Sequence, residues 1–125
     1  AGFEVTAILI VPDEIDAIAN AIASAEERLI VTTGGTGIAA RDVTPEATMS
    51  VCDRVIPGFG EVMRRTHPLA PLSRAQAAIR GTALVVNLPG SEKAAVENLQ
   101  AVLHLIPHAL ELLSGKTEHE RPARP

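Results

Sequence analysis

Two glycine-bearing loops in this sequence combine hydroxyl groups with backbone amides that no side chain obstructs. Residues 32–37 read Thr-Thr-Gly-Gly-Thr-Gly, and residues 87–91 read Asn-Leu-Pro-Gly-Ser just before a predicted helix. Amides in such loops and at helix N-termini bind anions, above all phosphate groups. Neither loop has the Gly-Lys-Ser/Thr of a Walker loop or the Gly-x-Gly-x-x-Gly spacing of the dinucleotide fingerprint. The pair predicts a site that could hold two phosphates, although glycines after strands are often only turns.

Two aspartates lie within reach of these loops. Asp42 follows the first loop by a few residues, and Asp13 follows the first predicted strand. Mg²⁺ is usually held by one or two carboxylates together with substrate phosphates, so this pattern is typical of a magnesium site. Each residue also has a purely structural interpretation: Asp13 as a first-turn acid that stabilises its helix, and Asp42 as half of a solvated pair with Arg41. Both interpretations stay open at this point.

Other reactive side chains have weaker cases. Cys52 has no basic neighbour in the sequence, which favours a small core residue over a nucleophile. His104 and His108 have a spacing that can bind metal on a helix, but Pro107 distorts that turn and no third ligand is evident. Packing or surface positions are therefore favoured for both histidines. Four arginines could help to hold phosphates, although solvated faces explain most arginines: Arg64, Arg65, Arg74 and Arg80.

Three apolar runs predict strands, and a helix pattern follows the first of them. Residues 3–11 are largely apolar and rich in β-branched side chains, and they end at Pro12, which predicts a strand buried on much of both faces. After it, apolar residues at three- and four-residue steps predict an amphipathic helix over residues 13–22. Residues 28–32 and 82–87 predict two more strands, each ending at one of the glycine-bearing loops.

Helix signals follow both loops. Thr44 as cap and Pro45 at the first helical position predict a helix that runs to about residue 56, where Pro57 and Gly58 break it. A short helix over residues 59–66 and an irregular stretch over residues 67–71 come next.

The C-terminal part has one long helix signal. Ser91 is a good cap for a helix over residues 92–113, and Pro107 should kink it. Residues 115–125 are charged and contain proline without an apolar anchor, so we expect disorder there.

This order of elements predicts an α/β protein with a mostly parallel sheet flanked by helices. In such sheets, ligands bind outside the carboxyl ends of the strands, where both glycine-bearing loops should lie. We therefore expect the site between the two loops, with Asp13 and Asp42 at the same edge.

The composition fits one domain and excludes several classes of function. A chain of 125 residues, 46% of them hydrophobic, builds a single core, and no apolar run approaches the ~20 residues that span a bilayer. The net charge of −4, scattered basic residues and the lack of Tyr and Trp argue against a nucleic-acid partner. The single cysteine and the absence of a leader pattern predict a cytoplasmic protein without membrane contact.

Residues 32–48 read Thr-Thr-Gly-Gly-Thr-Gly-Ile-Ala-Ala-Arg-Asp-Val-Thr-Pro-Glu-Ala-Thr and resemble the signature of the molybdopterin adenylyltransferase family of molybdenum-cofactor biosynthesis. Further matches follow in order along the chain: Val-Pro-Asp-Glu at 11–14, Ile-Pro-Gly-Phe-Gly at 56–60, Leu-Ser-Arg at 72–74 and Val-Asn-Leu-Pro-Gly-Ser at 86–91. The resemblance covers nearly all of residues 1–113. This family, or its close bacterial sister group, fits best.

The resemblance implies a three-layer molybdopterin-binding fold and a nucleotidyltransferase. In the reaction, Mg·ATP donates AMP to the terminal phosphate of molybdopterin, giving adenylyl-molybdopterin and pyrophosphate. Because the substrate's own phosphate is the nucleophile, the protein needs no activated side chain and acts by positioning and charge neutralisation.

Site residues are carried over position by position. The family's two functionally important aspartates match Asp42 and Asp13, as catalytic residues and as ligands of Mg²⁺. The first loop would cradle the pterin or its phosphate, and the residues after the 82–87 strand would form the opposite wall. The positions implied to bind substrate are Thr33, Gly34, Gly35, Thr36, Gly37, Ser73, Asn87, Pro89, Gly90 and Ser91.

The resemblance also implies a homotrimer and contact with a molybdenum-insertion protein. Family members open with a strand and a helix that would precede Ala1, so we expect residues 1–114 to form a molybdopterin-binding domain without its N-terminal strand. Two other functions remain open: a non-catalytic molybdopterin-binding protein that retains the pterin loop, and a structural subunit of a trimer.

Overall fold

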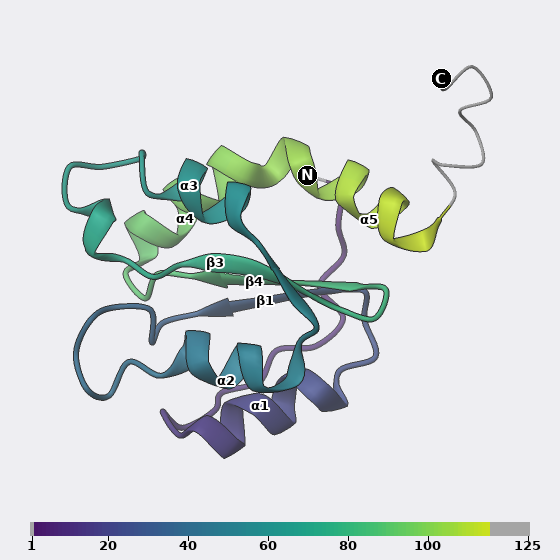
Figure 1. The fold of residues 1–125 in the computed structure, drawn as a ribbon, viewed down its shortest axis with the longest axis horizontal. Helices are drawn as coiled ribbons and strands as arrows, with labels where there is room; N and C mark the ends of the chain where they lie inside the picture. Colours follow the sequence, from purple (N-terminus) through teal and green to yellow (C-terminus); the bar gives the residue numbers. More distant parts are fainter. Residues whose placement is uncertain (1, 116–125) are drawn as a thin grey trace.

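The computed structural model describes residues 2–115, which form three layers (Figure 1). Helices α1 (Ile15–Ser24) and α2 (Thr44–Val51) cover one face of a central sheet. The other face is covered by α3 (Pro57–Met63), α4 (Glu92–Val102) and α5 (Ile106–Ser114). Among residues 2–115, none of the helices combines the length and the apolarity needed to cross a membrane. The predicted disorder of the tail concerns residues that, from 116 onward, lie outside the described part.

The sheet has four strands in the order β1-β4-β3-β2. They are β1 (Leu29–Thr33), β2 (Arg54–Ile56), β3 (Gln76–Arg80) and β4 (Ala83–Leu88). The α/β class is confirmed, but the expectation of a mostly parallel sheet is wrong. Only β1 and β4 are parallel, whereas β3 runs antiparallel to both β4 and β2. The reason is local: β3 and β4 are joined by a two-residue turn containing Gly81 at φ +60°, and so short a link cannot make a parallel crossover.

Strand β4 forms the centre of the core, because β1 and β3 pair with its two edges and helices cover both of its faces. Its alternating side chains divide between two clusters, with Val86 packing on the α3–α5 side and Val85 on the α1–α2 side. Both valines are fully buried. The C-terminal end of β4, where the second loop begins, is thus held rigidly from both faces.

The N-terminal apolar segment differs from its predicted strand. Residues 3–11 pair with no strand in the described chain and are largely exposed, with Ile8 83% and Ile10 99% accessible. An apolar, β-branched run indicates strand propensity, but a strand exists only where a neighbour accepts its backbone hydrogen bonds. The adjoining α1 agrees with prediction and buries Ile18, Ala19 and Ile22.

Two further corrections concern residues 52–80. Helix α2 ends at Val51, not near residue 56, and residues 54–56 form β2, which pairs with the unpredicted strand β3. Pro57 starts α3 at its first turn, where a missing N–H costs nothing, instead of merely breaking a helix.

The C-terminal helix is divided at the predicted proline. Helix α4 ends at Val102, a 3₁₀ turn follows at Leu103–Leu105, and Pro107 lies in the first turn of α5. The kink is therefore a complete interruption, since a proline suits a helix start better than a helix interior.

Thr48 on α2 offers a direct test of the packing beneath the sheet. Its side chain is fully buried, and its hydroxyl finds no hydrogen-bond partner among residues 2–115. We expect Thr48→Val to stabilise the fold by about 1 kcal/mol, because it removes an unsatisfied polar group while keeping the shape. Thermal unfolding should show a midpoint that is a few degrees higher. The matched change Thr66→Val should lower it, because that hydroxyl donates to the Met63 carbonyl; a lower midpoint for Thr48→Val would contradict the packing.

Candidate functional site

The two glycine-bearing loops lie side by side at one end of the sheet, as predicted. Strands β1 and β4 are parallel neighbours that pair Thr33 with Leu88, so both chains leave the sheet at the same edge. The Gly34 amide continues this ladder by donating to the Leu88 carbonyl over 2.9 Å. In Figure 1 both strands end on the left. In the structure the first loop continues past its glycines to the start of α2, so from here on the name covers residues 34–43 and includes Asp42; this loop extends beneath the sheet.

The contact between the two loops is made by glycine. A Cβ on Gly90 would lie 3.2 Å from the Gly34 Cα, so a side chain there would push the loops apart. Gly34 also has φ +95°, a conformation that L-residues rarely adopt. Both positions, which the family resemblance implied to bind substrate, therefore favour glycine for a physical reason.

Gly35 has the tightest surroundings of the first loop. Its φ is +71°, and a Cβ would lie 2.2 Å from the Oγ1 of Thr44, which is itself buried. The Gly35 carbonyl accepts the Thr44 amide over 3.1 Å. Thr44, predicted as a helix cap, instead lies inside α2 next to this glycine, and the cap position is Val43.

Asp42 faces back into its own loop and is half-buried. Its Oδ2 accepts the Ala39 amide, and its own amide donates to the Ala39 carbonyl, each over 3.0 Å. The carboxylate lies against Gly37, where a Cβ would come within 2.7 Å of Oδ2. No ion pair or hydrogen bond joins Asp42 to Arg41 in the described chain, so the structure does not support the alternative of a solvated pair. The exposed side of this carboxylate remains available to a ligand.

Asp13 lies at the same end of the sheet but is not brought into contact with Asp42. Helix α1 begins next to it and runs antiparallel to β1, so its start and the end of β1 share one edge (Figure 1). Its side chain is exposed and forms no hydrogen bond with other described residues. Within residues 2–115, no group of three or more His, Cys, Asp or Glu side chains could hold a metal ion.

Asn87 ties the strands together from inside the sheet. It is fully buried, its amide nitrogen donates to the Thr32 hydroxyl over 2.9 Å, and its oxygen accepts from Gln76 over 3.3 Å. It therefore supports the wall of the site from behind. Of the loop threonines, Thr36 is also buried, whereas Thr33 is exposed.

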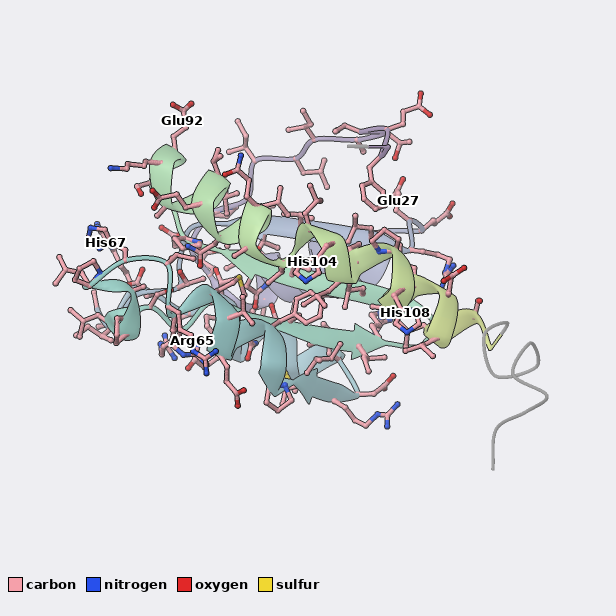
Figure 2. The ribbon with its side chains drawn as sticks, turned by 90° about the horizontal axis from the view of Figure 1, so that it is seen from above. Glu27, Arg65, His67, Glu92, His104 and His108 are labelled. Carbon is pink, nitrogen blue, oxygen red and sulfur yellow. The ribbon has the colours of Figure 1, made fainter. Side chains whose placement is uncertain are left out.

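A cavity of about 280 Å³ adjoins the second loop. The predicted residues Ser73, Pro89 and Ser91 line it together with His67 and Lys93, which the sequence analysis missed. The Ser91 side chain accepts the Ala94 amide and caps α4, as predicted. In Figure 2, Glu92 at the start of α4 and His67 are seen at the same end of the molecule, apart from each other. The lining combines a helix N-terminus, hydroxyls and an ammonium group, which suit negatively charged ligands, with the carboxylate of Glu97, which does not.

Arg74 contacts the first loop in a way that the sequence analysis did not predict. The Nε of its guanidinium donates to the Gly37 carbonyl over 2.9 Å and its Nη2 to the Asp42 carbonyl over 2.6 Å. Its Nη1 is paired with Glu46 on α2, and its backbone amide donates to the Thr36 carbonyl over 2.6 Å. No sequence spacing indicates this, because Arg74 lies more than thirty residues beyond the loop.

The pairing with Arg74 changes the acidity of the Glu46 carboxylate. Its hydrogen bond to Arg74 holds the pKa of Glu46 below the ordinary value. The stabilisation from the pair is thus present above the ordinary glutamate pKa and is lost as pH falls through the lowered one. Because the carboxylate is half-exposed, its contribution is at most about 1 kcal/mol.

Comparison with known proteins identifies the family. The sequence profile described as a probable molybdopterin binding domain matches residues 1–108. The chain belongs to this family. Among curated relatives of this molybdopterin-binding domain, the molybdopterin adenylyltransferase of Helicobacter pylori J99 is 47% identical over 114 residues, which cover 85% of this chain and 65% of that protein. The Escherichia coli K12 enzyme of the same name is 45% identical over 103 residues, or 70% of this chain and 53% of that protein.

A solved structure agrees with the assignment. The molybdopterin biosynthesis enzyme MoaB from Thermus thermophilus superimposes with a TM-score of 0.77 and 49% identity, covering 84% of this chain and 71% of that one. The three-layer molybdopterin-binding fold is thereby confirmed. The chain spans about two-thirds or less of the length of the two curated relatives, at 65% and 53%.

The residues set aside in the sequence lie away from the site of this molybdopterin-binding domain. Cys52 is half-buried against the α1–α2 cluster, and this burial raises the pKa of its thiol, which disfavours the reactive thiolate. His104 and His108 are both exposed, and in Figure 2 His108 lies toward the end opposite His67, with His104 between the two. The interpretation of all three as non-functional residues fits these positions.

Proposed function

We propose that this protein adenylylates molybdopterin in molybdenum-cofactor biosynthesis, with Mg·ATP as donor of AMP. The Helicobacter pylori relative that carries this name matches 85% of the chain, a share large enough to include both loops. The observation that carries the proposal is the juxtaposition of the two loops at the carboxyl ends of β1 and β4, joined through Gly34 and Gly90. Such a rigid pair of amide-rich loops suits a substrate that presents phosphates.

The protein's part in this reaction is positioning. The first loop would hold the pterin or its phosphate, while the wall formed by Pro89, Gly90 and Ser91 would face it. Ser73 and Lys93, across the adjoining cavity, would add a hydroxyl and a positive charge for the remaining phosphates. The terminal phosphate of molybdopterin attacks the α-phosphorus of ATP, the AMP–phosphate bond forms, and pyrophosphate leaves.

The donors present suit a magnesium ion. Carboxylate oxygens are the ligands that Mg²⁺ prefers, and the ion commonly uses only one or two of them beside substrate oxygens and water. The half-buried Asp42 carboxylate, oriented by the Ala39 amide, would hold the ion, and Asp13 would contribute from the neighbouring helix start. When bound, the ion would neutralise the charge on the phosphates of ATP.

The assembly and surroundings of the protein are part of the same proposal. A homotrimer, contact with a molybdenum-insertion protein and a cytoplasmic location are what the family assignment favours. Sedimentation of the purified protein would test the trimer directly.

An assay of AMP transfer tests the proposed function. The intact protein is incubated with molybdopterin and ATP labelled at the α-phosphate, with Mg²⁺ or with excess chelator. We expect labelled adenylyl-molybdopterin with Mg²⁺ and a loss of at least ~10²-fold with chelator, as for other phosphoryl-type transfers that need the metal. Binding of molybdopterin without turnover would instead favour the non-catalytic binding protein, and binding of neither substrate would favour the structural subunit.

A further inference from the structure

We propose that Arg74 is a positioning residue that clamps the first loop and thereby sets the orientation of Asp42. This inference deepens the proposed function and rests on it for its catalytic consequence. The first loop, residues 34–43, is long and lies mostly on the surface, with residues 38–41 exposed. Such a segment needs specific anchors to keep one conformation.

The anchors of the loop are unevenly distributed. Its two ends are held by the Gly34 amide on the Leu88 carbonyl and by the Thr44 amide on the Gly35 carbonyl. Between them, the only hydrogen bonds joining residues 36–42 to other parts of the described chain come from Arg74. The backbone amide of Arg74 donates to the Thr36 carbonyl, and its guanidinium donates to the Gly37 and Asp42 carbonyls. The held carbonyls thus lie on both sides of the turn that carries Asp42.

The shape of the guanidinium group explains why the residue is arginine. Three nitrogens in one rigid plane reach three different acceptors: the Gly37 carbonyl, the Asp42 carbonyl and the Glu46 carboxylate. A lysine has one nitrogen on a flexible stem and cannot span these acceptors together. The Glu46 contact also links the loop to α2, which begins immediately after it.

The consequence for Asp42 follows from its backbone. With its carbonyl held by Arg74 and its amide by the Ala39 carbonyl, the Asp42 peptide has little freedom, so its carboxylate points in one direction. Without the clamp the turn can shift by an ångström or more. A misplacement of that size costs about 10²-fold in rate at a site that works by positioning.

The test compares Arg74→Ala with Arg80→Ala. Arg80 is a matched control because its guanidinium also donates to a backbone carbonyl, that of Val51, which lies at the end of α2 away from the loop. We expect Arg74→Ala to lower AMP transfer by about 10²-fold and Arg74→Lys by about tenfold, while Glu46→Gln, which keeps an acceptor, stays close to wild type. Added guanidinium ion should partly restore Arg74→Ala, which a merely destabilised variant would not show.

Amide hydrogen exchange supplies a readout that does not depend on catalysis. In Arg74→Ala, the amides of Ala39 and Asp42 should exchange at least ~10-fold faster, while those of β1 and β4 remain unchanged. Unaltered loop exchange would overturn the clamp, and so would faster loop exchange with undiminished AMP transfer. If the wild-type protein transferred no AMP, the proposed function would fail, and loop exchange together with molybdopterin affinity would still decide the clamp.

Discussion

Asp42→Asn should lower AMP transfer to molybdopterin by about 10²–10³-fold while leaving the fold intact, an effect typical of removing one group that stabilises developing charge. Asparagine keeps an oxygen that can accept the Ala39 amide, so the turn retains its hydrogen bond and loses only the negative charge. The measurement is kcat/KM for AMP transfer together with the thermal midpoint. Asp42→Ala should lose the same activity and, in addition, about 1 kcal/mol of stability.

Asp53 provides the matched control for this prediction. Its Oδ2 likewise accepts a backbone amide, that of Gly81 over 2.8 Å, but at the turn between β3 and β4, the other end of the sheet. Asp53→Asn should therefore leave AMP transfer unchanged. If Asp42→Asn kept full activity while Asp42→Ala lost it, the residue would act through its hydrogen bond, and its role as a magnesium ligand would be wrong.

Gly35→Ala should be the most damaging of the glycine substitutions in the site. At φ +71° an alanine costs about 1–2 kcal/mol, and its Cβ would lie 2.2 Å from the buried Thr44 Oγ1, which adds about 1–3 kcal/mol of overpacking. The total is about 2–5 kcal/mol, a lowering of the midpoint by roughly ten degrees or more. Calorimetry or thermal unfolding followed by circular dichroism measures it.

Gly81→Ala separates the two causes. Gly81 has φ +60°, but a Cβ added there would meet no atom within 4 Å, so its alanine variant should show the conformational cost alone. Combining Gly35→Ala with Thr44→Ala removes the clashing oxygen and should recover part of the loss. Equal midpoints for Gly35→Ala and Gly81→Ala would show that the loop relaxes away from Thr44, and the contact would then have no energetic weight.

Local signals in the sequence predicted a large part of this fold. Ser91 caps α4, Pro107 interrupts the C-terminal helix and the α1 periodicity buries the expected face, because each depends on residues within one or two turns. The position of both loops after β1 and β4 was predictable for the same reason. The antiparallel strands β2 and β3 were not, since Arg54–Ile56 is a short segment whose strand identity depends on a partner more than twenty residues away.

For the site, local residue types were enough to predict the candidate residues, namely the glycines, hydroxyls and carboxylates in and near the two loops. The way in which these residues are held depends on contacts between segments that are distant in the sequence. Gly34 meets Gly90, Arg74 clamps the turn of Asp42, and residues 3–11 have no strand partner in the described chain. The physical reason is that backbone amides and carbonyls must find partners, and for loops and edges those partners are set by which distant segments the folded sheet brings together.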